Sequence, residues 1–87
     1  MQNTSSPATA IDVRRVPRPM RHPLIFGTFD RLDPNDSFDI VSDHDPQPLR
    51  YLFDVRYPDA FSWNYIESGP DVWRIRIERL ATEAALS

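Results

Sequence analysis

The stretch Ser42-Asp43-His44-Asp45-Pro46-Gln47-Pro48-Leu49 lies between a strand-like run and a helix-like run. The run before it, 37–41, places Phe38 and Ile40 on one side of an extended chain, as a strand with one buried face does. The run after it, 49–57, has apolar side chains at helical spacing: Leu49, Leu52, Phe53 and Tyr57. Ligand-binding groups collect where strands end and helices begin, so this junction marks the edge where we expect a site.

Upstream of this stretch the sequence predicts a short strand and a helix. The strand candidate is 11–13, and the helix is expected to start near 20–23, because proline is tolerated in a first turn. It should end at about Leu32 and bury one face, formed by Leu24, Ile25, Thr28, Phe29 and Leu32. Phe26 falls off that stripe, so we expect it to be partly exposed or to cover an edge. Residues 33–36 have the composition of a turn.

Downstream, two strands joined by a hairpin turn are expected. Residues 61–66 and 73–77 both alternate in polarity, and 68–71 contains the Gly-Pro pair of a turn. Arg74 and Arg76 share the solvent side of the last strand. Pro58 ends the second helix, and Asp45 followed by Pro46 predicts its N-cap and first residue.

The expected fold class is therefore α+β. The order strand, helix, strand, helix, strand, strand predicts a two-layer α/β sandwich in which two helices cover one face of a four-stranded mixed sheet. We expect one domain over residues 10–79, a disordered lead over 1–9 and a frayed tail over 80–87.

Composition excludes several classes of function. The chain has 87 residues and no cysteine, which excludes disulfides, thiolate nucleophiles and cysteine-bound metals. Its net charge of −3 argues against nucleic acid as a partner. We find neither a run long enough to span a bilayer nor a signal peptide, so we expect no membrane partner and a cytoplasmic location. There is no glycine-rich phosphate loop and no nucleophile elbow.

Polar side chains should converge on one edge of this sheet. Right-handed crossovers place the end of each strand beside the start of the next helix. Arg18, Arg21 and His22 belong to the first such junction, and Asp43, His44 and Asp45 to the second. Glu67 and Asp71 reach the same edge if the third strand runs parallel to the first two. Imidazole with carboxylate suits a transition metal, and helix N-termini attract anions.

Each of these groups also has a structural interpretation. The structural interpretation of Asp45 is that it caps the second helix, without a part in binding. The structural interpretation of His22 is that it caps the first helix or is simply exposed. His44 has the parity of Phe38 and Ile40, so it can be a packed histidine hydrogen-bonded to backbone. Arg74 and Arg76 can bind a partner, but a cross-strand pair with Asp39 competes with that role. The His-x-x-x-His spacing of a helical zinc site is absent.

Four blocks of sequence resemble a known family. They are Asp12-Val13-Arg14, Arg21-His22-Pro23-Leu24-Ile25-Phe26, the run from Asp43 to Tyr51, and Gly69-Pro70-Asp71-Val72-Trp73-Arg74-Ile75. In this order, over about 10–79, they resemble the bacterial domain of unknown function 2249. That family is similar to the TusA/SirA sulfur carriers, which implies a βαβαββ sandwich whose third strand is parallel to the first two.

The resemblance also bears on function. Sulfur carriers hold persulfide on a Cys-Pro-x-Pro motif, where this chain has Arg18-Pro19 and Arg21. Because persulfide chemistry needs a thiolate, sulfur transfer is disfavoured. The resemblance implies a redox, nitrogen-oxide or sulfur-related setting, with a redox, hemerythrin-type or cupin-type protein as partner.

We therefore expect a non-catalytic ligand- or metal-binding module, with a transition metal or heme as the possible cofactor. The expected ligands are His22 and His44, with Asp43, Asp45 and Glu67 in support and Arg18 and Arg21 for anions. One alternative is a protein-interaction module that uses Arg74 and Arg76 on the open sheet face, or Phe26 and Tyr51. Another is an enzyme in which a histidine is the general base.

Overall fold

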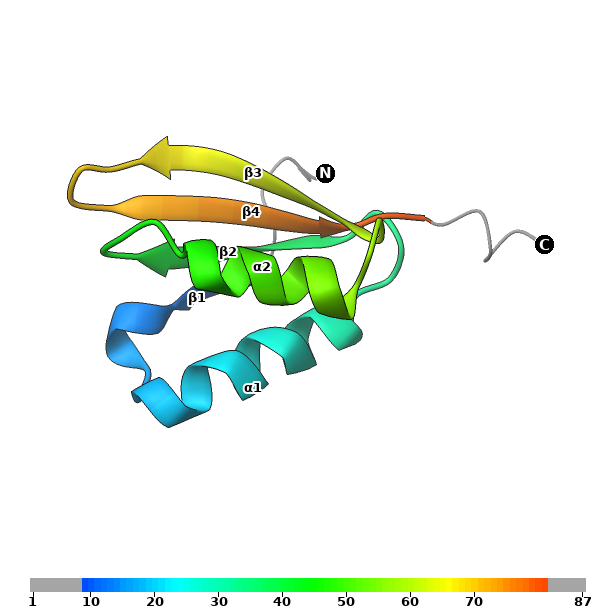
Figure 1. Ribbon diagram of the computed structural model, residues 1–87, viewed down its shortest axis with the longest axis horizontal. Coiled ribbons are helices and arrows are strands. Elements are labelled where there is room, and N and C mark those ends of the chain that lie inside the picture. The colour runs from blue at the N-terminus through cyan, green and yellow to red at the C-terminus, as the bar shows by residue number, and fades with distance from the viewer. Residues whose placement is uncertain (1–8, 82–87) are drawn as a thin grey trace, which may run out of the picture.

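The computed structural model describes residues 9–81, which form a four-stranded mixed sheet and two helices (Figure 1). The elements in chain order are β1 (Ala10–Asp12), the 3-10 turn η1 (Val13–Arg15), α1 (Arg18–Asp30), β2 (Ser37–Ser42), α2 (Gln47–Arg56), β3 (Phe61–Ser68) and β4 (Trp73–Arg79). The predicted α+β class, with a mixed sheet and two helices, is confirmed. Residues 1–8 of the expected disordered lead and residues 82–87 of the expected tail lie outside the described residues.

The strand order in the sheet is β1-β2-β4-β3. β1 pairs with β2 in parallel, and β4 is antiparallel to both β2 and β3. β3 therefore runs parallel to β1 and β2, so all three strands end at the same end of the sheet. Figure 1 shows that α1 and α2 also begin at this end, where the β3–β4 hairpin turns. The register of β3 against β4 shifts between Tyr65 and Glu67.

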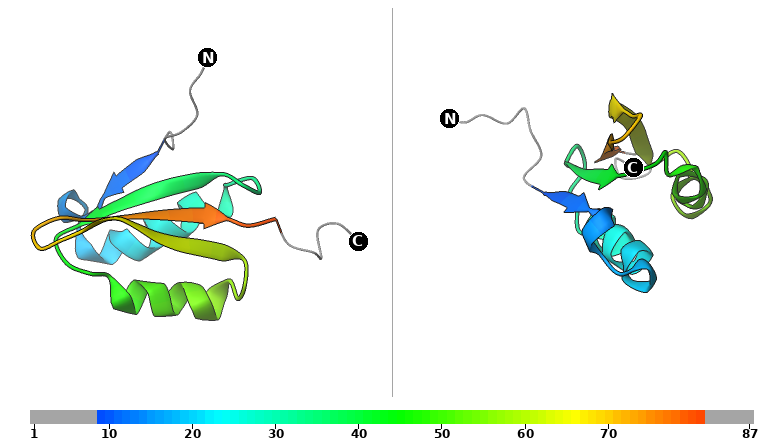
Figure 2. Two further views of the ribbon diagram at one scale, coloured as in Figure 1. Left: turned by 90° about the horizontal axis from the view of Figure 1, so that it is seen from above. Right: turned by 90° about the vertical axis from the view of Figure 1, so that its left-hand side faces the viewer.

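One core joins both helices to one face of the sheet, and Figure 2 shows the two helices on the same side of it. The face of β2 and β4 contributes Phe38, Ile40, Ile75 and Ile77 to this core. From the helices come Ile25 and Phe29 of α1 and Leu49 and Phe53 of α2. Burial of such side chains is the main stabilising contribution in a domain of this size.

The buried face of α1 differs from the predicted one. Leu24 is 42% exposed, although we predicted it in the buried stripe. Phe26 is half-buried and packs on Phe53, with ring centroids 5.2 Å apart. Because α2 lies beside α1, its aromatic side chains hold Phe26 and turn the helix so that Leu24 faces solvent.

The ends of several elements also differ from the predicted ones. β1 ends at Asp12, because its side chain accepts a 3.1 Å hydrogen bond from the backbone N–H of Arg14 and starts the turn η1. α1 begins at Arg18 and ends at Asp30, a few residues earlier at each end than predicted. The early start is possible because Pro19 lies in the first turn, where its missing N–H has no helical partner to lose.

The open face of the sheet carries a buried charge. Asp39 is buried there and accepts hydrogen bonds from Arg74 and Arg76 of β4. The predicted cross-strand pairing is thereby confirmed. No helix within the described residues is long and apolar enough to cross a membrane.

Candidate ligand-binding pocket

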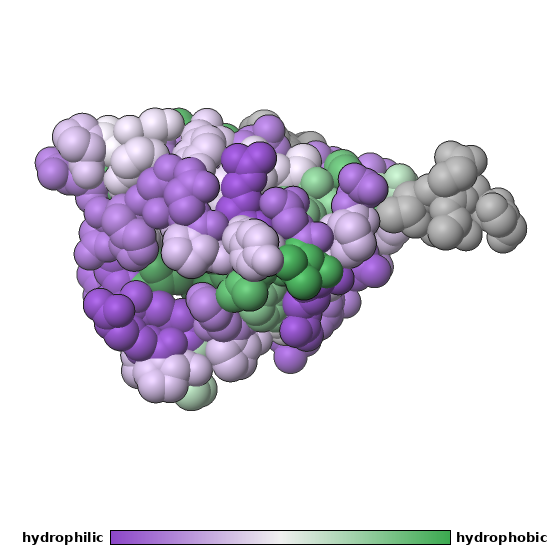
Figure 3. All heavy atoms as spheres, viewed as in Figure 1, coloured by the Kyte–Doolittle hydropathy of each residue, from purple (hydrophilic) through white to green (hydrophobic). Residues whose placement is uncertain are grey.

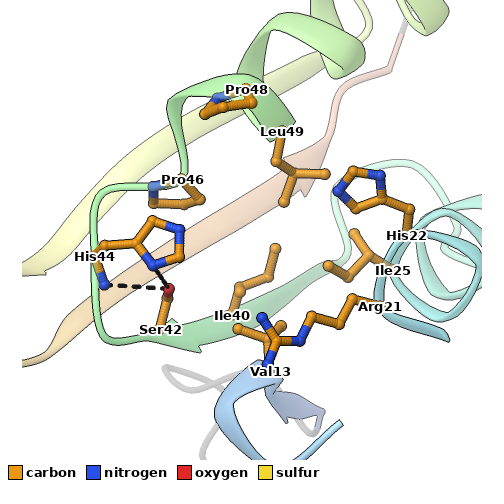
Figure 4. A pocket seen from close by; sticks show the side chains of 10 residues that line it. All are labelled: Val13, Arg21, His22, Ile25, Ile40, Ser42, His44, Pro46, Pro48 and Leu49. Atoms are coloured by element: carbon orange, nitrogen blue, oxygen red, sulfur yellow. Dashed lines mark hydrogen bonds between the residues drawn. The ribbon is translucent and has the colours of Figure 1, made fainter. Parts of the chain in front are cut away.

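A pocket of about 110 Å³ opens where α1 and α2 begin. Figure 3 shows the hollow between the two helices, with apolar side chains beneath polar ones at its mouth. The residues that line it are Val13, Arg21, His22, Ile25, Ile40, Ser42, His44, Pro46, Pro48 and Leu49 (Figure 4). Both histidines of the chain and one of the predicted anion-binding arginines therefore meet at one site.

The floor of the pocket is made of core side chains. Val13 follows β1, Ile25 belongs to α1, Ile40 to β2 and Leu49 to α2. All four are less than 10% exposed, so their positions are fixed by packing. The pocket thus offers an apolar surface at the end of the hydrophobic core.

The wall that comes from α1 carries Arg21 and His22. The Nε of Arg21 donates a 2.8 Å hydrogen bond to the backbone oxygen of Val16, which anchors the half-buried guanidinium. Within residues 9–81, no protein acceptor lies within hydrogen-bonding distance of its two Nη groups. His22 is exposed and lies inside the helix, with its ring edge against Phe26 at 6.0 Å between centroids. It therefore does not cap α1, which was one of its predicted roles.

The opposite wall carries His44, in the loop between β2 and α2. Its Nδ1 lies 2.8 Å from Oδ1 of Asp43 and 3.4 Å from Oγ of the buried Ser42. The backbone N–H of His44 also donates to Ser42 Oγ, at 3.3 Å. The side chain of His44 is 62% exposed, so it is not the packed core histidine that its parity suggested. Its second ring nitrogen, Nε2, is turned towards the pocket (Figure 4).

Charges around the pocket keep the carboxylates ionised. The hydrogen bond from His44 lowers the pKa of Asp43, and the charge of Arg21 adds to this effect. An ionised Asp43 accepts from Nδ1–H, so neutral His44 presents an unprotonated Nε2 to the pocket. Beneath the pocket, hydrogen bonds from Arg14 lower the pKa of Asp12 to about 2. This ion pair holds the turn that carries Val13.

Asp45 has a different role from the predicted N-cap. The N-cap position of α2 is Pro46, and no side chain caps the helix there. Asp45 instead accepts a 2.8 Å hydrogen bond from the hydroxyl of Tyr65 and another, also 2.8 Å, from the side chain of Gln47. The helix begins one residue later than the Asp-Pro pair suggested, so the Asp45 carboxylate is not needed as a cap. Its two hydrogen bonds connect β3 to the start of α2.

The other predicted site residues lie outside the pocket. Arg18 is the exposed first residue of α1, and Glu67 is exposed beyond the irregularity in β3. Arg74 and Arg76 lie on the open sheet face, against Asp39. Of the predicted site residues, Arg21, His22 and His44 line the pocket at this end of the sheet.

The two histidines do not face each other across a shared centre. Figure 4 shows them on opposite walls of the pocket, with Leu49 between them. Among residues 9–81, no three His, Asp or Glu side chains come together in a group that could hold a metal ion. The chemistry that the pocket offers is a charged guanidinium and two imidazoles above an apolar floor.

Sequence reasoning missed Ser42, Pro46 and the apolar floor. The signal for Ser42 was present, because it shares the parity of Phe38 and Ile40 and therefore points to the core side at the strand end. No comparable signal identified Val13 or Leu49 as pocket residues, since apolar side chains of this kind are expected in the core whether or not a pocket adjoins them.

Comparisons with known proteins identify a family. Residues 10–79 match the model of a family described as "Uncharacterized conserved protein (DUF2249)". Neither the curated proteins nor the solved structures contain a significant match to the chain. The geometry of the pocket is therefore the main guide to what this chain does.

Proposed function

Because the chain belongs to the DUF2249 family of uncharacterized conserved proteins, we propose a function from its pocket: a non-catalytic module that binds a small ligand where α1 and α2 begin. The observation that carries the proposal is the meeting of Arg21, His22 and His44 around one apolar-floored pocket. These side chains come from two separate crossovers. Pockets with an apolar lining and a few convergent polar groups are the usual form of small-molecule sites.

The size of the pocket limits the ligand. An enclosed apolar cavity of about 150 Å³ holds benzene, and this pocket measures about 110 Å³ and is open to solvent. It suits a molecule of a few non-hydrogen atoms, part of which can extend into solvent. A heme is far too large to be enclosed here, so heme is not part of the proposal.

A metal ion is also left out of the proposal. His22 and His44 lie on opposite walls of the pocket. Among the described residues, no group of three or more histidine, aspartate or glutamate side chains could hold a metal ion. Structural zinc sites use four ligands, and catalytic ones use three protein ligands. An organic ligand that contacts both walls fits the separation of the two imidazoles better than one metal ion does.

We also infer a relationship to the sulfur carriers at the level of the fold. The strand order β1-β2-β4-β3, with β3 parallel to β1 and β2, supports it. Arg18 and Pro19 occupy the first turn of α1, where the carriers have their cysteine and proline. The pocket adjoins this turn, so the proposed binding site keeps the position of the carrier site while its chemistry changes.

The experiment that tests the proposal is an NMR screen of the full chain with neutral and charged fragments of up to about eight non-hydrogen atoms, a size set by the benzene comparison. Fragments that bind should shift the methyl resonances of Val13, Ile25, Ile40 and Leu49 in a saturable way. Shifts scattered over the surface, or no saturable shift at all, would refute a small-molecule site.

A matched pair of variants makes the screen specific. Leu49→Phe adds bulk inside the pocket, and the same change at Leu52 adds it to α2 at a half-buried position that does not line the pocket. We expect Leu49→Phe to abolish fragment binding and Leu52→Phe to leave it intact, with both variants showing dispersed spectra of a folded protein. Equal loss in both variants would contradict the assignment.

A further inference from the structure

Arg21 is the only side chain of fixed charge in the described lining of the pocket, and it points to the class of ligand. Its Nε is occupied by the backbone oxygen of Val16, whereas its two Nη groups have no protein partner within residues 9–81. A guanidinium held in this way presents a rigid pair of donors, which matches the two oxygens of a carboxylate. A positive charge left beside an apolar floor is best satisfied by an anion on the ligand.

The surroundings of Arg21 favour a monoanion. Asp43 is ionised, and Arg21 is one of the charges that lower its pKa, so a negative charge already lies at this end of the pocket. A phosphate dianion would be repelled by Asp43 more strongly than a monoanion would be. A carboxylate carries one charge and has two oxygens in the plane that the guanidinium prefers.

The floor defines the rest of the ligand. Val13, Ile25, Ile40 and Leu49 offer hydrocarbon surface and no hydrogen-bonding side chain. The ligand that fits both features has a carboxylate at one end and a short hydrocarbon body of a few carbon atoms. Resting on the small-ligand function proposed above, we propose that the pocket binds short-chain monocarboxylates, with Arg21 pairing with the carboxylate.

The test is a titration of the full chain with two probes of nearly the same shape, sodium propionate and propionamide, followed by NMR of the pocket methyl groups and of the Arg21 side chain. We expect propionate to bind at least about tenfold more tightly than propionamide, the usual size of a lost charge-assisted hydrogen bond. Inorganic phosphate, as a third probe, should bind more weakly than propionate at this site.

Three variants complete the test. Arg21→Gln should reduce propionate affinity by about tenfold or more and bring it close to that of propionamide. Arg21→Lys keeps the positive charge but loses the planar guanidinium, so it should retain part of the preference for propionate over propionamide. The same variant also loses the hydrogen bond to Val16, so its spectrum shows whether that loss alone disturbs the fold. Arg18→Gln removes an exposed arginine of the same helix turn that does not line the pocket, and it should leave binding unchanged.

The outcomes separate the two proposals. Equal, saturable binding of propionamide and propionate in the pocket would overturn the carboxylate inference and keep the small-ligand function. Tighter binding of phosphate would overturn the carboxylate inference in favour of a phosphorylated ligand. If propionate shifts only resonances outside the pocket, or if Arg18→Gln weakens binding as much as Arg21→Gln, the inference is likewise wrong. If no probe or fragment shifts the pocket methyl groups, both proposals fail.

Discussion

Arg76 Nε donates a 2.8 Å hydrogen bond to Oδ1 of Asp39, a carboxylate with no exposed surface on the open face of the sheet. Arg74 completes the arrangement with a 2.6 Å hydrogen bond to Oδ2. The two arginines lie on the same side of β4: Arg76 is directly opposite Asp39 of β2, and Arg74 is opposite Val41 and reaches Asp39 from the next same-side position. This arrangement neutralises a charge that would otherwise be costly to bury. It also engages the two arginines that the sequence offered as contacts for a partner protein.

Replacing Asp39 with Asn should destabilise the fold. The amide keeps the shape of the side chain but leaves two arginines without their anion, so we expect a loss of about 1–3 kcal/mol in the free energy of unfolding. Urea unfolding followed by tryptophan fluorescence measures it. Asp54→Asn is the control, because Asp54 is exposed on α2. A loss of the same size in the control would mean that the effect is one of overall charge.

The stabilising effect of Asp39 should vanish in acid. Burial raises the pKa of Asp39, but hydrogen bonds and charges from Arg76 and Arg74 lower it more, so the pKa lies below its ordinary value of 3.8. Since the folded-state pKa is the lower one, the carboxylate stabilises the fold above pH 3.8 and loses this effect as the pH falls through 3.8 towards the folded-state pKa. The difference in unfolding free energy between the wild type and Asp39→Asn should therefore be largest near neutral pH and shrink in acid. A difference that stays constant down to about pH 2, below the ordinary range of aspartate, would contradict this linkage.

Asp43 should fix the tautomer of His44. Its ionised carboxylate accepts from Nδ1–H at 2.8 Å, which leaves Nε2 of the neutral ring unprotonated. In Asp43→Ala we expect the two neutral tautomers of His44 to mix, visible in the ¹⁵N chemical shifts of the ring nitrogens. His22, whose side chain has no hydrogen bond to the protein within residues 9–81, serves as the internal reference and should not change. An unchanged His44 spectrum would show that Ser42 or solvent sets the tautomer.

The convergence of His22 and His44 could be predicted because it depends on chain topology alone. The two strand–helix–strand crossovers bring the ends of β1 and β2 to the start of α1 and α2, and the hydrophobic patterns placed both crossovers correctly. The pairing of Asp39 with Arg74 and Arg76 was equally accessible, because strand parity decides which side chains share a face.

The finer geometry of the site depends on contacts between elements, which sequence patterns do not contain. Leu24 and Phe26 are both acceptable at a helix surface, and only the position of Phe53 on α2 decides which of them is covered. Asp45 before Pro46 has the sequence of an N-cap, but Tyr65 on β3 competes for its carboxylate. Single-residue shifts of this kind decide which side chains line a pocket of this size.

Two glycines give opposite predictions for the same substitution. Gly69 has φ of 75° in the β3–β4 turn, and a methyl group there would lie 2.8 Å from Cε2 of Trp73. Gly69→Ala should therefore cost about 1–2 kcal/mol from the left-handed backbone alone, and more from the contact with the indole. Gly27 lies inside α1, with no atom within 4 Å of an added methyl group. Gly27→Ala should accordingly stabilise the fold by about 0.5–1 kcal/mol, because alanine favours the helix interior. Thermal unfolding of both variants beside the wild type checks the signs, and destabilisation by both would show that the surface around Gly27 is more crowded than the structure indicates.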